Sequence, residues 1–553
     1  MLGPYIGLAM DETKINDIQI LMHIHNALGV KLSPLSFIGI SMIFIFSLRL
    51  FFAILINKKI LSFCRNVQVS LRSNLMSAYQ TMTYETFIDR DSADAITNIT
   101  ILPMYFTNNV LFIILKATAE LLLALFVLSF LLFVNGLLVL ILSVGLGVLV
   151  FLYNNFFKAR LNLYGKNINI ANSNVVQSVK QALDGVKEVR VLGKESFFHN
   201  RLSSNAQLYA SLHASSVLIS IGSRYFLEFA LMIFFVGVIL FSDILMSSDT
   251  SVVFATIGMF AFASIRLLPG VNILSSAVLQ LRTQKNTVDR LHETIKQLDL
   301  EINFDNLSLI RENTEEEKDI SFESIKLGNI SYAYPNAPRS ILANINIEIH
   351  KGEAVGIVGS SGSGKTTLID IFLGLLTPKS GTIYVNGVLL SEIIQDWRKM
   401  SAYIPQESLM INESLSSNIQ LAELDGSNVQ NDLLATSIQQ AKLGEVVKNL
   451  PDGLQTSLGE NGIRLSGGQR QRVSLARAIF HSREVLIFDE ATSALDTETE
   501  TKVMTEIKKM KGAKTIIIVA HRTDTLRFCD RIYKLENGSI GAVGTPDEVF
   551  GHK

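Results

Sequence analysis

The feature that most constrains the fold of this chain is a series of long apolar segments in its first half. Each segment has about the 20 residues that a helix needs to cross a bilayer. We expect full membrane spans near Ser36–Ile56, Asn109–Phe133, Leu137–Phe157, Arg224–Phe241 and Ser251–Ser275. Lipid offers the backbone no hydrogen-bond partners, which restricts such segments to helices. The first half is therefore predicted to be an α-helical transmembrane domain.

The overall composition agrees with this division. Only 18% of the 553 residues are charged, whereas a soluble domain carries about 25%. The formal net charge of −1 argues against a nucleic-acid partner, because nucleic-acid-binding domains are usually basic. The two cysteines, Cys64 and Cys529, are too few for a disulfide framework or a cysteine-ligated metal site.

Lysine and arginine in the connections predict the orientation of the spans. Basic residues follow the first span and recur between Lys158 and Arg201, whereas the Asn135-Gly136 turn and the Ser242–Thr250 loop have none. Short cytoplasmic connections are the ones enriched in Lys and Arg. Five crossings then begin outside and end inside, so we expect a multi-pass protein of the inner (plasma) membrane with its C-terminal half in the cytoplasm.

The N-terminus does not fit this topology as it stands. Met1–Met10 is apolar but has only about half the length of a span. We interpret it as the outer end of a first spanning helix that is mostly absent from this sequence, through either a real loss or a misassigned start.

Two polar stretches, Asn57–Pro103 and Lys158–Ser215, are predicted to continue the spans as helices into the cytoplasm. Each contains a point where the chain can reverse, at Phe87–Asp91 and at Leu183–Val186. From Phe322 onward, short β-branched runs alternate with turn signals and helical segments, which is typical of an α/β domain.

A phosphate-binding loop of the form G-x-x-x-x-G-K-[ST] lies early in this second half, between an apolar strand at Ala354–Val358 and a helix that continues from Thr367. Such a loop turns backbone N–H groups toward an anion at a helix N-terminus. Its lysine reaches the β- and γ-phosphates, and the hydroxyl that follows binds Mg²⁺. We therefore expect ATP and Mg²⁺ as ligands. The loop consists of Gly359, Ser360, Ser361, Gly362, Ser363, Gly364, Lys365 and Thr366, and Thr367 completes the expected nucleotide contacts.

A second motif, Leu465-Ser466-Gly467-Gly468-Gln469, follows about a hundred residues later. With both motifs, the C-terminal half resembles the nucleotide-binding domain of an ABC transporter, and the whole chain resembles an exporter-type half-transporter. The resemblance implies a fold of transmembrane helices joined to an α/β P-loop ATPase. We expect the transmembrane domain at residues 1–300, an acidic linker at 301–321 and the nucleotide-binding domain at 322–553.

The resemblance also implies roles for single residues. Tyr334 would stack on adenine, and Gln406 would touch Mg²⁺ and sense the membrane domain. Asp489 ends a buried strand, where a carboxylate can hold the water shell of Mg²⁺. Glu490 would be the base that activates water, and His521 would contact the γ-phosphate. Ser493–Asp496 matches the loop that follows the catalytic glutamate.

In this family the second motif, Ser466, Gly467, Gly468 and Gln469, faces the γ-phosphate held by a partner subunit. The chain has one such domain, so the resemblance implies a dimer. Every ATPase motif is intact, which favours a homodimer over a pair with one degenerate site, and a heterodimer with a similar chain stays open as the alternative.

The membrane half carries several ionisable residues that could contact cargo. Lys116/Glu120 and Arg224/Glu228 are spaced i,i+4 and can form local ion pairs. Arg49 and Arg266 have no such partner, and each costs about 2.5–3.5 kcal/mol at the centre of a span. One reading is that these residues snorkel to the interface or pair locally. The other is a basic belt that receives an anionic headgroup, with Arg49 and Arg266 as its substrate-contacting members.

Short stretches of this half also resemble the bacterial ABC flippase that turns over lipid-linked oligosaccharides. The stretches are Pro4–Ile6, Leu8–Asp11, Ser47–Leu50, Arg224–Glu228 and Ile265–Pro269. That family has a short outer helix that contacts the polyprenyl tail. Ile15–Leu28 occupies the same place here, either with that role or as an interfacial anchor.

The sequence thus predicts an ATP hydrolase coupled to transport, which flips a polyprenyl-pyrophosphate-linked saccharide by alternating access of a dimer. A general lipid or multidrug exporter is the alternative within this class. A membrane nucleotide sensor without turnover is the alternative outside it, although a placed base such as Glu490 serves no purpose in a sensor.

Overall fold

The computed structural model of the chain describes residues 34–88, 90–134, 136–240, 250–298, 321–335, 339–421, 428–490, 497–520 and 523–551. These residues form two compact units. The first contains the long helices that follow residue 34, and the second contains the sheets that follow residue 321, together with residues 83–88. The predicted outer segments Met1–Met10 and Ile15–Leu28 and the linker at 301–320 lie outside the described residues.

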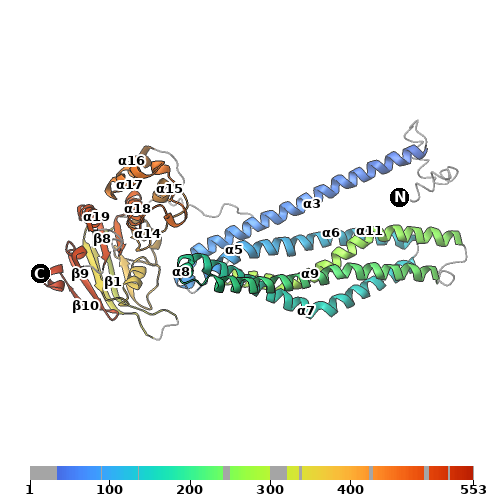
Figure 1. Ribbon diagram of the computed structural model, residues 1–553, viewed down its shortest axis with the longest axis horizontal. Coiled ribbons are helices and arrows are strands. Elements are labelled where there is room, and N and C mark those ends of the chain that lie inside the picture. Colours follow the sequence, from blue (N-terminus) through green and yellow to red (C-terminus); the bar gives the residue numbers. More distant parts are fainter. Residues whose placement is uncertain are drawn as a thin grey trace. The chain divides into compact units, whose positions relative to one another are not determined.

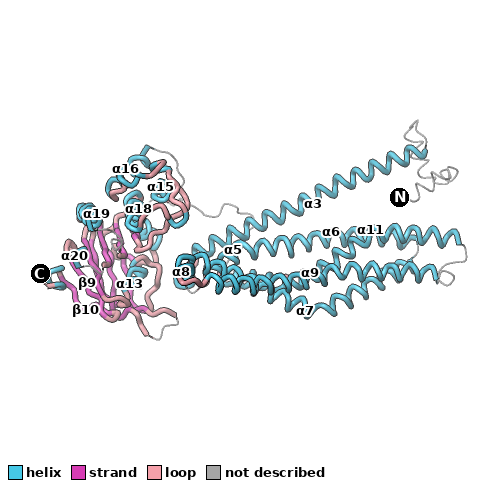
Figure 2. The backbone as a smooth tube through the Cα atoms, in the orientation of Figure 1, coloured by secondary structure: helices cyan, strands magenta, loops and turns pink. Residues whose placement is uncertain are grey.

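The first unit is entirely helical in its described part, with long helices extended along one direction (Figures 1 and 2). Its elements are α3 (Pro34–Thr81), α5 (Ser92–Phe106), the π-helical turn η2 (Thr107–Leu111), α6 (Phe112–Val134), α7 (Gly136–Asp184), α8 (Val186–Val191), α9 (Glu195–Leu240), α11 (Thr250–Thr283) and α12 (Lys285–Gln297).

The lengths of these helices confirm that the spans continue as helices beyond the apolar segments. Helices α3, α7 and α9 have 48, 49 and 46 residues, more than twice what a bilayer requires. By length and apolar composition, four helical stretches in the described residues can cross a membrane, beginning at Gly39, Ser92, Gly136 and Glu195. The fifth predicted span lies on α11.

The second of these helical stretches, which begins at Ser92, contains a feature that the sequence does not predict. Between α5 and α6 the helix widens into the π-turn η2, where the N–H of Phe112 donates to the carbonyl of Thr107 five residues earlier. Pro103 lies one turn before it and cannot donate a backbone hydrogen bond. The buried Thr107 hydroxyl donates to the Pro103 carbonyl at 2.8 Å. Proline and π-turns are common causes of local bends in long helices.

Both predicted reversals occur where the sequence placed them. Helix α7 ends at Asp184, and α9 begins at Glu195 after the short helix α8. Helix α3 ends at Thr81, and α5 begins at Ser92 with Asp91 as its N-cap. The short helix between them, α4 (Tyr84–Ile88), belongs by its contacts to the second unit, where Tyr84 packs against the apolar core.

The first unit has small internal cores where its helices cross. One joins α6, α7, α9 and α11 through Leu131, Leu138, Leu231 and Leu267. The close approach of α7 to α11 depends on Gly165, because a Cβ at this position would overlap the carbonyl group of Thr283. Glycine is the residue that permits such backbone proximity.

The second unit is an α/β fold with two sheets. A six-stranded sheet has the order β10-β9-β3-β8-β7-β6, and a four-stranded antiparallel sheet has the order β2-β1-β4-β5. The strands are β1 (Ser324–Tyr332), β2 (Leu342–His350), β3 (Ala354–Gly359), β4 (Ser380–Val385), β5 (Val388–Leu389), β6 (Ser401–Ile404), β7 (Val485–Asp489), β8 (Thr515–Val519), β9 (Arg531–Glu536) and β10 (Ser539–Gly544).

The helices of this unit connect the parallel strands or follow them. They are α13 (Lys365–Phe372), α14 (Ile394–Met400), α15 (Leu415–Gln420), α16 (Asn428–Gln440), α17 (Gly444–Asn449), α18 (Gly467–Phe480), α19 (Thr497–Met510), α20 (Thr523–Leu526) and α21 (Pro546–Phe550), with 3₁₀ turns η3 (Gly453–Gln455) and η4 (Glu460–Gly462).

The strand register determines where the functional groups meet. Strand β8 pairs in parallel with both β3 and β7, and Asp489 lies opposite Val519. The carboxyl ends of all three strands therefore share one edge of the sheet, which is where ligands bind in open α/β folds. The phosphate loop and the Asp489-Glu490 pair leave the sheet at this edge.

Candidate ATP-binding site

The phosphate loop begins at the end of β3 and closes onto the first turn of α13. Gly362 and Gly364 have φ values of 78° and 103°, which side-chain-bearing residues rarely adopt. A Cβ on Gly364 would also approach Leu342 Cδ2 to 2.8 Å. Ser360, Ser361 and Thr366 are exposed along the loop, whereas Thr367 is buried in α13.

Lys365 lies across this loop. Its Nζ donates to the carbonyl oxygens of Gly359 and Ser360, each at 3.0 Å, and its side chain is buried. Burial lowers the pKa of Lys365, and the nearby carboxylates of Glu490 and Asp489 oppose that effect. The buried Ser363 hydroxyl has no hydrogen-bond partner among the described residues. A partly desolvated ammonium and an unpaired hydroxyl in one glycine-rich loop fit a phosphate ligand.

Asp489 is buried at the end of β7 and accepts a hydrogen bond of 3.0 Å from the Tyr403 hydroxyl. Burial raises the pKa of Asp489, whereas the Tyr403 hydrogen bond lowers it. Asp370 on α13 is a neighbouring carboxyl group whose pKa is raised to about 6 by burial and by Asp489. The sequence analysis assigned no role to Asp370 or to the Tyr403 hydroxyl. Tyr403 lies close to Gln406 in the sequence, and this nearness to an expected site residue is the feature that could have predicted a role for it.

Glu490 follows Asp489 in a left-handed backbone conformation with φ of 50°. A residue other than glycine adopts this conformation at a cost of about 1–3 kcal/mol, and such residues cluster at functional sites. Its N–H donates to Val519, and its carboxylate accepts from the Gln406 side chain at 3.3 Å. The structure thus brings together Glu490 and Gln406, which are 84 residues apart in the sequence.

Ser466 is the N-cap of the 14-residue helix α18. Its hydroxyl accepts from the Gln469 N–H at 3.3 Å, and the Gln469 side chain accepts from the Ser466 N–H at 2.9 Å. This capping box holds the helix start rigid. Ser466 is exposed and Gly467 is partly exposed, so the helix N-terminus presents free N–H groups to an incoming anion.

Tyr334 is partly exposed and forms an edge-to-face contact with Tyr332, with ring centroids 5.2 Å apart. The ring is thus partly accessible beside the apolar cluster that it packs against. His521 and the Ser493–Asp496 segment lie outside the described residues.

The candidate cargo residues lie on the helices of the first unit. Arg49 is exposed on α3, with its guanidinium 6.0 Å from the Phe46 ring. Arg266 lies on α11, and its side chain is outside the described part. Arg224 and Glu228 form the local ion pair that their spacing predicted, at 2.7 Å.

Three comparisons with known proteins bear on this arrangement. A family model described as "ABC transporter" matches residues 342–493, which include the phosphate loop, the Ser466 helix start and Glu490. The fold resembles that of a bacterial Atm1-family ABC exporter solved with ATP bound. The TM-score is 0.76 over 99% of this chain and 95% of that one, at 21% identity. The chain has the fold of an exporter-type ABC half-transporter.

Curated relatives of the chain are named ATP-dependent lipid A-core flippases. The protein from Ralstonia nicotianae is 37% identical over 227 residues, which is 41% of this chain and 38% of the relative. The protein from Chromobacterium violaceum is 39% identical over 216 residues, covering 39% and 36% of the two chains. The matched part of the chain thus spans less than two fifths of the length of these relatives.

Proposed function

We propose that the chain hydrolyses ATP as a homodimer in the inner membrane and uses that energy to flip a polyprenyl-pyrophosphate-linked saccharide. The observation that carries this proposal is the Glu490–Gln406 contact beside Lys365 and Asp489. These four residues provide a base, a polar sensor, a phosphate-binding cation and a metal-binding carboxylate at one edge of the sheet. A phosphoryl-transfer site requires such a set of groups.

The roles follow from the position of each group. The loop amides and Lys365 bind and orient the phosphates, and Glu490 accepts a proton from the attacking water. Thr366, Asp489 and Gln406 would hold Mg²⁺, which supplies charge neutralisation between the β- and γ-phosphates. The Tyr403 hydrogen bond keeps Asp489 oriented and favours its ionised form, as a metal ligand requires.

Packing within the second unit supports the coupling of hydrolysis to the membrane helices. Tyr84 on α4 packs against an apolar cluster that includes Leu368 and Phe372 of α13, the helix that begins at the phosphate loop. Because α4 lies between α3 and α5 in the chain, it is the segment through which the proposed coupling would act.

Exposed apolar side chains support the homodimer. At the tip between α7 and α9, outside the apolar spans, Val191 is 81% exposed and Leu192 is 69% exposed. Exposed apolar patches at a water-facing tip mark protein contacts. The exposed N-terminus of α18 also needs a phosphate from elsewhere, and a second copy of the chain meets both requirements.

The lipid-linked saccharide is favoured by the local resemblances near Arg49 and Arg266, and a lipid cargo in general by the relatives named lipid A-core flippases. A general lipid or multidrug exporter is the second candidate, supported by the extensive apolar surface of the helices.

Reconstitution of the chain in liposomes tests the proposal. The lipid-linked saccharide carries a labelled sugar, and its flipping is followed by the accessibility of that sugar to a membrane-impermeant oxidant. We expect ATP-dependent loss of accessibility in the wild type and none in Glu490→Gln. ATPase stimulation by hydrophobic drugs but not by the lipid-linked saccharide would favour the second candidate. Full turnover by a monomer would refute the dimer.

A further inference from the structure

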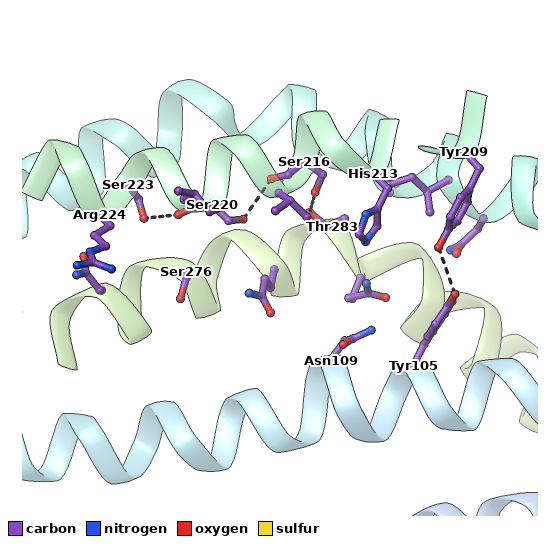
Figure 3. A pocket seen from close by; sticks show the side chains of 18 of the residues that line it. Tyr105, Asn109, Tyr209, His213, Ser216, Ser220, Ser223, Arg224, Ser276 and Thr283 are labelled. Carbon is purple, nitrogen blue, oxygen red and sulfur yellow. Dashed lines mark hydrogen bonds between the residues drawn. The ribbon is translucent and has the colours of Figure 1, made fainter. Parts of the chain in front are cut away.

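A cavity of about 620 Å³ lies among α5, η2, α7, α9 and α11 of the first unit (Figure 3). This volume is within the range of small-molecule sites. Its lining extends from the pair Tyr105 and Tyr209 at one end to Arg224 at the other. Arg224 and Ser275 mark the predicted cytoplasmic ends of two spans, so the Arg224 end of the cavity is at the level where a lipid headgroup of the inner leaflet would lie, and the tyrosine end lies farther along the helices toward the cytoplasm.

The lining is unusual in its charge. Among the lining residues that the structure describes there is no Asp, Glu or Lys, and Arg224 is the single arginine. Its guanidinium is held by Glu228 at 2.7 Å, so the charge of that end is already balanced. A phosphate accepts hydrogen bonds only and is bound best by unpaired cations. Besides Arg224, His213 is the only basic side chain in the described lining, so the lining is poor in the unpaired cations that an anionic group requires.

The remaining polar groups both donate and accept. Asn109, Asn272, Gln280 and Gln284 provide amides, and Ser220 and Ser276 provide hydroxyls. The two serines donate to helix carbonyls at 3.3 Å and 3.1 Å, which leaves their oxygen lone pairs free to accept. Sugar hydroxyls also donate and accept, so amides and hydroxyls match them whereas charged groups match only half of their capacity.

Asn272 adds evidence for a ligand. Its side-chain oxygen is buried and has no hydrogen-bond partner among the described residues. An unpaired buried acceptor destabilises the fold, and a hydroxyl in the cavity would satisfy it. At the far end, the Tyr105 and Tyr209 hydroxyls are 3.5 Å apart, and the Tyr209 ring stacks on His213. Aromatic rings of this kind can cover the apolar face of a sugar.

We propose that this cavity binds the uncharged saccharide part of the transported amphiphile. The inference rests on the proposed function. It adds that the sugar and the charged phosphate of the cargo are bound at different places. The sugar enters from the cytoplasmic side and is recognised by Asn272, Gln280 and the tyrosine pair.

Binding without nucleotide tests this inference separately from hydrolysis. The full chain in phosphatidylcholine nanodiscs is titrated with tritiated glucosyl diacylglycerol or with phosphatidic acid of the same acyl chains. We expect the glucosyl lipid to bind more tightly. Asn272→Leu, which has a similar volume but no amide, should weaken its binding about tenfold without affecting phosphatidic acid.

The matched control is Asn205→Leu on α9. Asn205 does not line the cavity, and its amide donates to the Arg201 carbonyl at 2.9 Å, so this variant should bind as the wild type does. If Asn272→Leu does not fold, Gln280→Leu replaces it in the same assay. Equal or tighter binding of phosphatidic acid, or unchanged glucosyl-lipid binding in the folded cavity variant, would overturn the inference. Loss of ATP-dependent flipping with intact, Asn272-dependent binding would instead count against the proposed function alone.

Discussion

The two units of this chain differ in how far they bury their large apolar side chains. In the ATPase unit, two apolar clusters enclose the sheets, and side chains such as Ile357 and Ile487 have no exposed surface. In the helical unit, large apolar side chains point outward, and Phe126 and Phe133 are 76% and 91% exposed. The ATPase unit buries its apolar core within one chain, whereas the helical unit requires lipid or another subunit around it.

The chemistry of one unit and the specificity of the other therefore depend on different structural features. The chemistry of the ATPase unit depends on a few side chains fixed by a closed core. The helical unit obtains its specificity from a cavity and from close helix crossings, because lipid supplies little drive for one helix to pack on another. Substitutions in each unit test this contrast.

Glu490→Gln should have the largest effect. Loss of the base should lower ATP hydrolysis at least about 100-fold, since general-base catalysis contributes about 10²–10⁴-fold. Nucleotide binding should persist and should trap the ATP-bound dimer, as measured by light scattering and filter binding. Lys365→Ala is the matched comparison and should weaken nucleotide binding itself. Normal turnover in Glu490→Gln would show that the ATPase unit does not rely on this carboxylate.

Truncation of one apolar side chain in each unit tests the contrast directly. Ile487→Ala should lower the free energy of unfolding of the ATPase unit by about 2–5 kcal/mol, because it leaves a cavity in a closed core. Phe126→Ala removes a larger side chain from a lipid-facing surface and should change the stability of the helical unit in detergent far less.

The chain carries its own reporters for these two measurements. Trp397 is the single tryptophan. It is buried in the same cluster as Ile487 and donates to the Phe372 carbonyl at 2.7 Å, so its fluorescence follows the ATPase unit. Buried Cys64 on α3 reports on the helical unit through thiol labelling in a Cys529→Ala background. Equal losses in the two variants would contradict the contrast.

Two glycines of α7 test the importance of helix crossings. Gly165→Ala should lower the stability of the helical unit by about 1–3 kcal/mol, because the added methyl group overlaps the Thr283 backbone. At Gly145 a Cβ has no described atom within 4 Å, so Gly145→Ala should be neutral or should stabilise the helix by about 0.5–1 kcal/mol. Cys64 labelling during thermal unfolding compares them, and similar stability of the two variants would argue against tight packing at this crossing.

The same contrast explains what the sequence could predict. Strand β3, its glycine loop and Lys365 follow from local pattern, because backbone geometry and phosphate chemistry fix the residue types. The helix lengths and the reversal at Asp184 follow from apolar runs and turn residues. The contact of Glu490 with Gln406, the raised pKa of Asp370 and the unpaired Asn272 depend on residues distant in sequence. No local sequence pattern predicts such contacts, and none predicts the π-turn at Thr107–Leu111.

Glu506 should give the smallest effect. This residue of α19 forms ion pairs with Lys442 at 2.8 Å and with Lys509 at 3.0 Å. Both ammonium groups lower the pKa of Glu506, and Lys442 has the larger effect. A carboxyl group with a lowered folded-state pKa stabilises the fold above its unfolded pKa of about 4.3 and loses that contribution as the pH falls through the folded pKa.

Glu506→Gln should therefore reduce the free energy of unfolding by less than about 1 kcal/mol at pH 7, as solvent-accessible pairs usually do. The difference from the wild type should vanish at pH values below both pKa values. Urea unfolding followed by Trp397 fluorescence at several pH values measures it. Glu498→Gln on the same helix removes one more exposed ion pair, to Lys502 at 2.7 Å, and is the comparison that should show a smaller effect. A difference that grows as the pH falls would reverse the sign and would mean that the two lysines do not stabilise the ionised carboxylate.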